Sequence, residues 1–527
     1  MIVTSSHNEP RERPGALAPL REPLFRNLWA ANALSNIGGM VQGIGAAWLM
    51  TAMTAGDPRL VSLVQTAAAL PVVLLSIVAG VLADTLDRRL VMLFGQATAI
   101  LGAAGLVALT WVGTATPAIL LVATFLIGSG YAVTNPGWYA SFREQVSPGL
   151  LEPAVMLNAL GFNLARSIGP AVGGLIIAVG GVIAAFAVNT LSYIPLFVAL
   201  WRWRPAVPKR PIPPERFLPA LAAGPRYIAY MPIPFAALFR SMMFGLIGSA
   251  IWALMPLVAR NTLHGGPAML GLLLFAFGLG AACGAVLRAR LALDRAAMLA
   301  VCTIGYAIAS AVLGYATIVP LALAACLLAG ACWVAALSGL NVALQLHSAR
   351  WVGARVVALL QVALFLGMGL GSAIWGALAG EIGLGNALGV SGGVMLLSLG
   401  LAKLTPLPEE DEPDLSPLHP EPPLLDMDWR AGPVRTRVTY RVPAEHHAVF
   451  ADALCAIGRL RRRDGARHWS LSQGDQHWVE SFETPCLLDD LHRRGRITAA
   501  DAALREKLAT LSEGPPKVER SIGGVVL

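Results

Sequence analysis

A short charged segment separates two long apolar runs near the start of the chain. The runs cover residues 60–83 and 90–112, and the segment across their junction, 80–89, reads GVLADTLDRR. Its charged residues are Asp84, Asp87, Arg88 and Arg89. An apolar run of roughly 20 residues is long enough to cross a bilayer as a helix. The pattern therefore predicts two membrane spans joined by a tight, charged hairpin.

The composition extends this prediction to most of the chain. Of its 527 residues, 56% are hydrophobic and only 13% are charged, whereas soluble domains carry about 25% charged residues. The chain is therefore expected to be an integral membrane protein, with the lipid bilayer as its surroundings. The net charge of +8 does not indicate a nucleic-acid partner, because excess Lys and Arg in a membrane protein usually mark cytoplasmic loops.

The apolar runs predict twelve spans. They are 25–53, 60–83, 90–112, 118–139, 153–177, 182–201, 233–258, 268–287, 296–315, 320–345, 356–380 and 386–405. The loops on one side hold two basic residues, Arg59 and Arg260, and those on the other side hold 14. The positive-inside rule then places the N-terminal segment (1–24) and the C-terminal end in the cytoplasm. Two ends on the same side of the membrane require an even number of spans, and twelve satisfies this condition.

The spans divide into two similar halves. The proline-rich and basic segment 202–232 reads as a cytoplasmic linker between six helices in 25–201 and six in 233–405. Residues 163–174 of the first half resemble residues 365–376 of the second, at an offset of 202 residues. Two parallel six-helix repeats with a binding site between them are an architecture of secondary transporters. The predicted fold class is thus an all-α membrane protein with two six-helix repeats.

The last 122 residues differ from the rest. Residues 406–433 hold eight prolines and eight acidic residues, which predicts an extended linker. Residues 434–527 then alternate strand and helix signals in the order β-α-β-β-α-β, which is a ferredoxin-like α+β arrangement. The soluble domain is expected in the cytoplasm.

Polar residues inside predicted spans are the candidates for a substrate site. A charge deep in a span is costly and normally faces a cavity or a partner, which singles out Arg166. Asn163 lies one helical turn before it, on the same face. Further candidates are Asn32, Asn36, Asn135 and Asn341. Each amide has an alternative role in hydrogen bonding between helices. Protons are a candidate coupling ion through a carboxylate at a helix end, such as Glu144.

Four segments carry a resemblance to a known family. They are the hairpin 80–89, Pro23-Leu-Phe-Arg-Asn-Leu-Trp-Ala-Ala-Asn32, Asn135-Pro-Gly-Trp138 and Asn158-Ala-Leu-Gly-Phe-Asn-Leu-Ala-Arg-Ser-Ile-Gly-Pro170. Together they resemble the major facilitator superfamily, in its enterobactin-exporter-like branch. The resemblance implies a multi-pass bacterial inner-membrane exporter that moves siderophores, drugs or other small molecules by alternating access, without a cofactor.

The resemblance also implies gating residues. In the superfamily, the loop that matches Gly80, Asp84, Asp87, Arg88 and Arg89 latches the two halves together. The helix-5 motif of its exporters resembles the run Gly169, Pro170, Gly173 and Gly174. Proline kinks a helix and glycines allow a close neighbour. An ordinary packing kink is the alternative.

The C-terminal segment resembles antibiotic-biosynthesis-monooxygenase domains, which usually pair in dimers. That resemblance leaves a rival function open, a membrane-anchored, cofactor-independent oxygenase. A further alternative is a sensor or scaffold that binds a ligand without moving it. A membrane anchor requires far fewer than twelve spans, so the expected function is an exporter with a small-molecule substrate.

Overall fold

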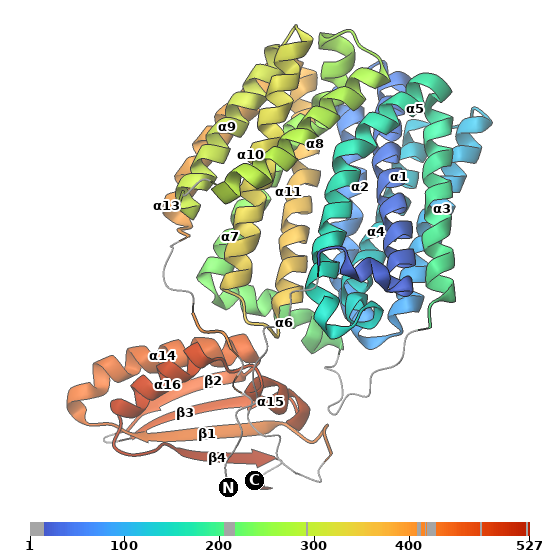
Figure 1. The fold of residues 1–527 in the computed structure, drawn as a ribbon. Coiled ribbons are helices and arrows are strands. Elements are labelled where there is room, and N and C mark those ends of the chain that lie inside the picture. The colour runs from blue at the N-terminus through green and yellow to red at the C-terminus, as the bar shows by residue number, and fades with distance from the viewer. Residues whose placement is uncertain are drawn as a thin grey trace.

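The computed structural model describes residues 15–204, 217–290, 293–407, 413–416, 418, 428–474, 477–522 and 525–526. Within these ranges the chain forms a large bundle of long helices, followed by a small α+β domain (Figure 1). Parts of the predicted segments 1–24, 202–232 and 406–433 lie outside the described residues.

The bundle has two halves. The N-terminal half consists of α1 (Pro23–Met53), α2 (Pro58–Thr85), α3 (Arg88–Trp111), α4 (Pro117–Gln145) and α5 (Leu151–Arg202). The C-terminal half consists of α7 (Pro232–Leu257), α8 (Pro267–Arg290), α9 (Arg295–Tyr315), α10 (Val319–Leu346), α11 (Gly353–Ile382), α12 (Leu384–Leu397) and α13 (Leu401–Leu404). We call the end of the bundle beside the small domain the domain end, and the opposite end the far end.

The helix α5 reverses direction at Gly181, whose φ of 73° lies in the left-handed region that glycine adopts without strain. Both of its ends lie at the domain end. The carbonyl of Leu157 accepts a hydrogen bond of 3.2 Å from the Trp29 indole, and that of Leu200 accepts one of 2.9 Å from the Arg89 guanidinium. The helices predicted at 153–177 and 182–201 thus form on either side of this glycine.

Ten helices in the described ranges are long and apolar enough to cross a membrane, with α5 counted once. The 31-residue helix α1 is not among them. It is long enough, but it carries polar side chains such as Asn32, Asn36 and Gln42 along its length, which lower its hydropathy. The polar residues of α1 therefore explain why hydropathy alone does not select this helix as a span.

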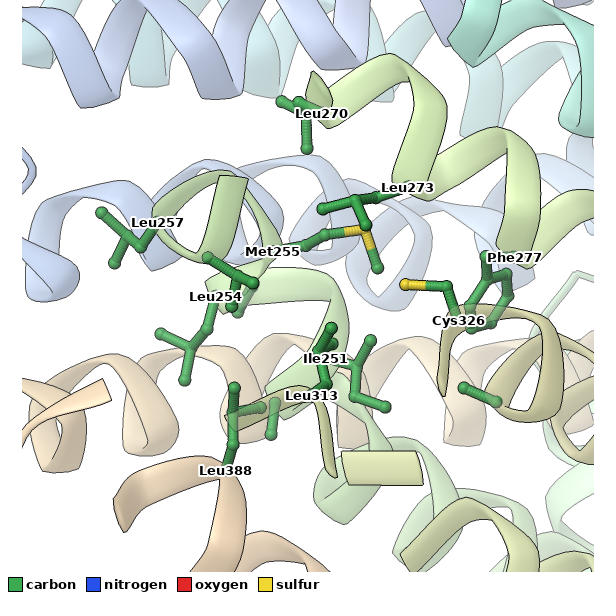
Figure 2. Close-up of a cluster of buried hydrophobic side chains, with 14 of the residues drawn as sticks. Ile251, Leu254, Met255, Leu257, Leu270, Leu273, Phe277, Leu313, Cys326 and Leu388 are labelled. Atoms are coloured by element: carbon green, nitrogen blue, oxygen red, sulfur yellow. The ribbon is translucent and has the colours of Figure 1, made fainter. Parts of the chain in front are cut away.

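A large apolar core holds the C-terminal half together. Ile251, Leu254 and Met255 of α7 meet Leu273 and Phe277 of α8. Figure 2 shows Leu313 and Leu388, from α9 and α12, on the other side of the α7 residues. All of these side chains are less than 4% exposed. Between membrane helices this close packing acts through van der Waals contact, because lipid is as apolar as the core, and it holds the helices of the half together as a unit.

The linker between the halves contains a helix that the sequence analysis did not anticipate. The helix α6 (Phe217–Tyr230) packs against α2 of the N-terminal half and against α7 and α11 of the C-terminal half. Its Tyr227 is fully buried. The Tyr227 hydroxyl donates to the carbonyl of His347 (3.2 Å) and accepts from the amide of Ala349 (3.0 Å). The helix α6 is therefore anchored to the α10–α11 loop at the domain end.

The small domain is an antiparallel sheet covered by helices on one face. Its strands are β1 (Val434–Arg441), β2 (Arg467–Gln473), β3 (His477–Thr484), β4 (Lys517–Ile522) and β5 (Val525–Val526), in the spatial order β2-β3-β1-β4-β5. Its helices are α14 (His447–Asp464), α15 (Leu487–Arg494) and α16 (Ala499–Thr510). Figure 1 shows α14 and α16 over the sheet, on the side of the bundle. Strand β1 alternates buried and exposed residues, as a half-buried strand should.

The small domain contacts the bundle through the end of α14. The Arg226 Nε of α6 donates a hydrogen bond of 3.0 Å to the carbonyl of Arg463, and the Arg463 guanidinium lies 5.6 Å from the centre of the Tyr227 ring. Beside them, the Arg496 guanidinium lies 4.3 Å from the ring centre of Trp351, in the α10–α11 loop. The domain is thus attached to α6 and to the C-terminal half.

Candidate functional site: a cavity beside the contact between the halves

A cavity of ≈ 310 Å³ lies among the helices of the N-terminal half and is bordered by the C-terminal half. Most of its lining comes from α1, α2, α4 and α5, while Trp252, Ala253 and Pro256 of α7 and Phe365 of α11 close one side. Apolar residues dominate the lining, with polar groups at separate points. That combination is typical of sites for small organic molecules.

Three of the predicted site residues line this cavity. Asn32 and Asn36 are four residues apart on α1, so their side chains lie on one face of the helix. Asn135 of α4 also lines it. An amide offers both a donor and an acceptor, so these side chains can orient a ligand that carries hydroxyl or carbonyl groups.

The other predicted site residues lie elsewhere. Arg166 does not line the cavity. Its guanidinium lies 5.9 Å from the ring centre of Trp252, and Trp252 does line the cavity. Asn163 is exposed on α5. Asn341 of α10 accepts a hydrogen bond of 2.9 Å from Gln345 on its own helix. The structure thus brings Asn32, Asn36 and Asn135 together in one lining and places Arg166 outside that lining, next to Trp252.

Three glutamines that line the cavity were missed by the sequence analysis, namely Gln42, Gln65 and Gln96. Gln42 of α1 accepts a bond of 3.3 Å from Asn189, and Gln96 of α3 donates one of 3.3 Å to Thr134. Gln42 Nε2 and Gln96 Oε1 are buried without a hydrogen-bond partner among the described residues. A glutamine within an apolar run is as informative as an asparagine, and extending the search to that residue type would have found all three.

The charged hairpin is tied into the N-terminal half. Asp87 caps α3 by accepting from the amide of Arg89 (2.9 Å), and Arg88 forms an ion pair of 2.6 Å with Glu144 at the end of α4. Arg89 also donates to the last carbonyls of α5, those of Leu200 (2.9 Å) and Trp201 (2.5 Å). A cation is favourable at a helix C-terminus. The side chain of Asp84 lies outside the described residues.

The glycine run of α5 marks a close approach of helices. A Cβ at Gly174 would lie 2.9 Å from Gly271 Cα of α8, and one at Gly169 would lie 2.6 Å from Met40 Cβ of α1. Gly173 faces Val41 of α1 at 3.0 Å. The Pro170 carbonyl belongs to the same contact, since it would lie 2.9 Å from a Cβ at residue 271.

Gly80 differs from these positions, because the nearest atom to its Cβ position is 3.9 Å away. Of the predicted gating residues, those of the glycine run thus lie at a tight contact of α5 with α1 and α8, and Gly80 lies at a more loosely packed position on α2.

Contacts between the halves also occur toward the far end. Arg59 of α2 forms an ion pair with Glu381 of α11, and the Thr66 hydroxyl donates to the Gly369 carbonyl (2.9 Å). Arg260 donates to the Thr51 carbonyl (2.5 Å) at the end of α1. The halves therefore meet in the far-end part of the bundle, and at the domain end α6 spans between them.

A family profile described as "Transmembrane secretion effector", of the major facilitator class, matches residues 14–524. The chain belongs to the transmembrane secretion effector family. The match includes the small domain, so both parts of the chain are features of the family. Members of the transmembrane secretion effector family are transporters and not enzymes, and this one is a multi-pass bacterial inner-membrane exporter of the major facilitator type.

Curated relatives agree with the family. The chain is 29% identical over 336 residues to an enterobactin exporter of Citrobacter koseri, covering 60% of this chain and 76% of the relative. It is 30% identical over 286 residues to the enterobactin exporter of Escherichia coli O1:K1 / APEC, where the match covers 51% of this chain and 64% of the relative.

Solved structures show the same fold for the bundle. The peptide-transporter-family structure PepTSo covers 73% of this chain and 97% of its own, with a TM-score of 0.59 and 12% identity. A bacterial homologue of the human lysosomal transporter Spinster, in an inward-facing and unoccupied conformation, covers 73% and 95%, with a TM-score of 0.54 and 15% identity. These identities support the fold alone.

Proposed function

We propose that this exporter moves a small, largely apolar molecule with several hydrogen-bonding groups, of the siderophore class, from the cytoplasm by alternating access. The observation that carries the proposal is the cavity at the contact between the halves, with its apolar lining and separate amides Asn32, Asn36 and Asn135. The name of the relatives, enterobactin exporter, supports the siderophore class.

Arg166 extends this proposal to anionic or catecholate-like groups. Its guanidinium faces the Trp252 ring across the contact between the halves. A ligand that displaces or stacks on Trp252 would come within reach of the positive charge. Arg166 of the N-terminal half and Trp252 of the C-terminal half would then contact the same ligand.

The membrane topology belongs to the same proposal. Counting α5 as two spans and adding α1 to the ten apolar helices gives twelve, the number expected from the sequence. The loops at the domain end hold the excess of basic residues, which favours the cytoplasm for that end and for the small domain. Far-end contact between the halves would then correspond to an inward-facing state.

The small domain and the coupling ion complete the proposal. The strand order β2-β3-β1-β4 supports a ferredoxin-like domain, and dimerisation through it is retained as a hypothesis. For proton coupling through Glu144, protonation would have to release this carboxylate from Arg88, its partner at 2.6 Å. Such a release would couple proton binding to the hairpin.

Transport into inverted membrane vesicles tests the proposal. A catecholate siderophore, a hydroxamate siderophore and a lipophilic drug are compared, with and without a proton gradient. We expect saturable uptake of the catecholate, with KM raised about tenfold by Asn135→Ala, since a lost ligand hydrogen bond is worth roughly 1–1.5 kcal/mol. Asn386→Ala, at the exposed far end, is the matched control. Uptake that is absent for every compound, or is insensitive to Asn135→Ala, would refute it.

A further inference from the structure

The interior of the small domain is strongly charged on one side. Its apolar core lies around Phe450, Leu454 and Trp478. Next to this core, the guanidinium groups of Arg461 (α14) and Arg493 (α15) each lie 4.8 Å from the ring centre of Phe482 on β3. Two cations against one buried ring are unusual in a domain of this size and call for counter-charges.

Among the described residues, the carboxylates nearby are too few for the arginines. The buried Glu480 accepts from Arg461 (3.2 Å) and from the Trp469 indole (2.9 Å). The buried Asp490 accepts from Arg493 (2.7 Å) and Arg494 (2.8 Å). The arginines around these two acids are Arg461, Arg493, Arg494, Arg505 and Arg520.

The cluster, defined as the five arginines with Glu480 and Asp490, carries an excess of three positive charges. The next acids offset this excess only in part. Asp464 and Asp501 share one arginine, Arg463, at 2.7 Å each, and their charges also act on Arg505. Counted with Arg463, they lower the excess from three charges to two.

Unpaired donors point into the same space. In the part of the chain that the structure describes, the Nε atoms of Arg505 (α16) and Arg520 (β4) are buried without a hydrogen-bond partner, as are the hydroxyls of Thr436 (β1) and Thr484 (β3). Thr436 is the cross-strand partner of both Arg520 and Phe482, so these side chains share one face of the sheet. Buried polar groups are nearly always bonded. Four without partners on three strands and one helix indicate a missing acceptor.

The electrostatics agree with the geometry. Burial, and then the charges of Arg461 and Arg493, lower the pKa of Arg505 to about 10. Burial, and then Arg494, also lower the pKa of Arg520. Both shifts mean that the folded domain disfavours the charged arginines as they stand. An added anion would relieve that cost.

We propose that this cluster is a binding site for an oxyanion with two or three negative charges, either a phosphate group or a polycarboxylate. Arginine forks bind both by paired, charge-assisted hydrogen bonds, and the threonine hydroxyls supply further donors. The ligand can enter from solvent, because the side chains of Arg461 and Arg494 are 12% and 18% exposed.

The site lies next to the contact with the bundle. Arg461 of the cluster and Arg463 of the contact with Tyr227 are two residues apart in the last turn of α14. A ligand that draws Arg461 toward β4 would shift the same turn that meets α6. Binding of a cytoplasmic oxyanion at the proposed site would therefore change the contact between the small domain and α6, and so regulate the transporter. This regulation goes beyond the export proposed above.

Calorimetry on the full-length protein in detergent tests the site. The protein is titrated with inorganic phosphate, with citrate and with chloride at matched ionic strength, and hydrogen exchange is followed at residues 434–441 and 517–522. We expect phosphate or citrate, but not chloride, to bind one site per chain and to slow exchange in both segments. Tighter binding of phosphate than of citrate would indicate a phosphoryl ligand, and tighter binding of citrate would indicate a polycarboxylate.

Variants make the test specific. Arg520→Gln and the nearly isosteric Thr436→Val should each weaken binding, the first by at least about tenfold because a charged hydrogen bond is lost. Arg437→Gln, on the exposed face of β1, is the matched control and should bind as the wild type does. Equal binding of chloride and the oxyanions would overturn the proposal. So would oxyanion binding that neither Thr436→Val nor Arg520→Gln weakens, or that Arg437→Gln weakens equally.

Discussion

At the scale of single residues, the chain uses cations to join elements. Arg89 caps the end of α5, Arg88 joins the hairpin to α4, and Arg166 reaches the ring of Trp252 in the other half. Arg166 stands 15 residues after the start of α5, roughly 22 Å along the helix. A charge at that depth needs a compensating partner, and an aromatic ring that borders the cavity provides one.

Replacing Arg166 should impair transport more than stability. The Arg166 guanidinium lies 5.9 Å from the Trp252 ring centre, near the outer limit of a cation–π contact, so its loss should change stability little. A hydrogen bond between a charged group and the substrate is worth about 1.5–3 kcal/mol, so we expect Arg166→Ala to lower kcat/KM for an anionic substrate by at least roughly tenfold. Arg166→Lys should retain part of the activity. The measurement is vesicle transport, with Leu164→Ala, an exposed change on the same helix, as the control. Normal transport by folded Arg166→Ala would exclude the role.

The hairpin ion pair gives a second prediction. In Glu144→Gln, Arg88 keeps its bonds to the carbonyls of Ala83 (3.1 Å) and Ala140 (3.3 Å), so membrane insertion should persist. The lost charge should lower the free energy of unfolding by about 1 kcal/mol and transport several-fold, and Asp84→Asn is expected to impair transport as well. Thermal unfolding and vesicle uptake measure the two effects, with exposed Glu152→Gln as the control. Unchanged uptake in both variants would count against a latch.

At the scale of elements, helix contacts depend on where glycine permits them. Gly174 and Gly271 bring α5 and α8 together across the halves, with a Cβ at either position within 3.0 Å of backbone of the other helix. This contact lies toward the far end, as does the pair of Arg59 (α2) with Glu381 (α11). Two rigid bundles that meet through such a contact can separate there without repacking their cores.

An added methyl group should therefore favour separation. Gly174→Ala places a Cβ 2.9 Å from the Gly271 Cα, and overpacking costs about 1–3 kcal/mol. We expect the population with closed far ends to fall roughly tenfold, seen as longer distances between spin labels at Thr114 and Ile318. In Gly393→Ala, where a Cβ meets open space, the distances should not change. Identical distances in both variants would refute the prediction.

The same contacts explain what the sequence could predict. Apolar periodicity located the long helices and the alternation of β1, because burial in lipid or under helices leaves a local pattern. It could not reveal the amphipathic α6, whose burial depends on distant partners such as His347 and Ala349. In the cavity, Asn32 and Asn135 followed from polarity, whereas the position of Arg166 next to Trp252 depends on how the halves pack.

At the scale of the whole molecule, the small domain contacts segments that alternating access would displace. It contacts α6 and the α10–α11 loop, and α6 in turn touches both halves at the domain end. If alternating access brings the halves together at this end, α6 has to shift. The attached domain would then resist the shift and stabilise the conformation described here.

Trp351→Ala should weaken this attachment. The Arg496 guanidinium lies 4.3 Å from the Trp351 ring centre, a contact worth about 0.5–2 kcal/mol, so the detached fraction should rise by roughly 2- to 30-fold. Hydrogen exchange in α14 and α6 should accelerate, while the sheet stays protected because its own core is intact. Trp111→Ala, exposed at the far end, should leave exchange in both helices unchanged. If α14 and α6 exchange as slowly in Trp351→Ala as in the wild type, the domain is held by other contacts and does not restrain the bundle through this loop.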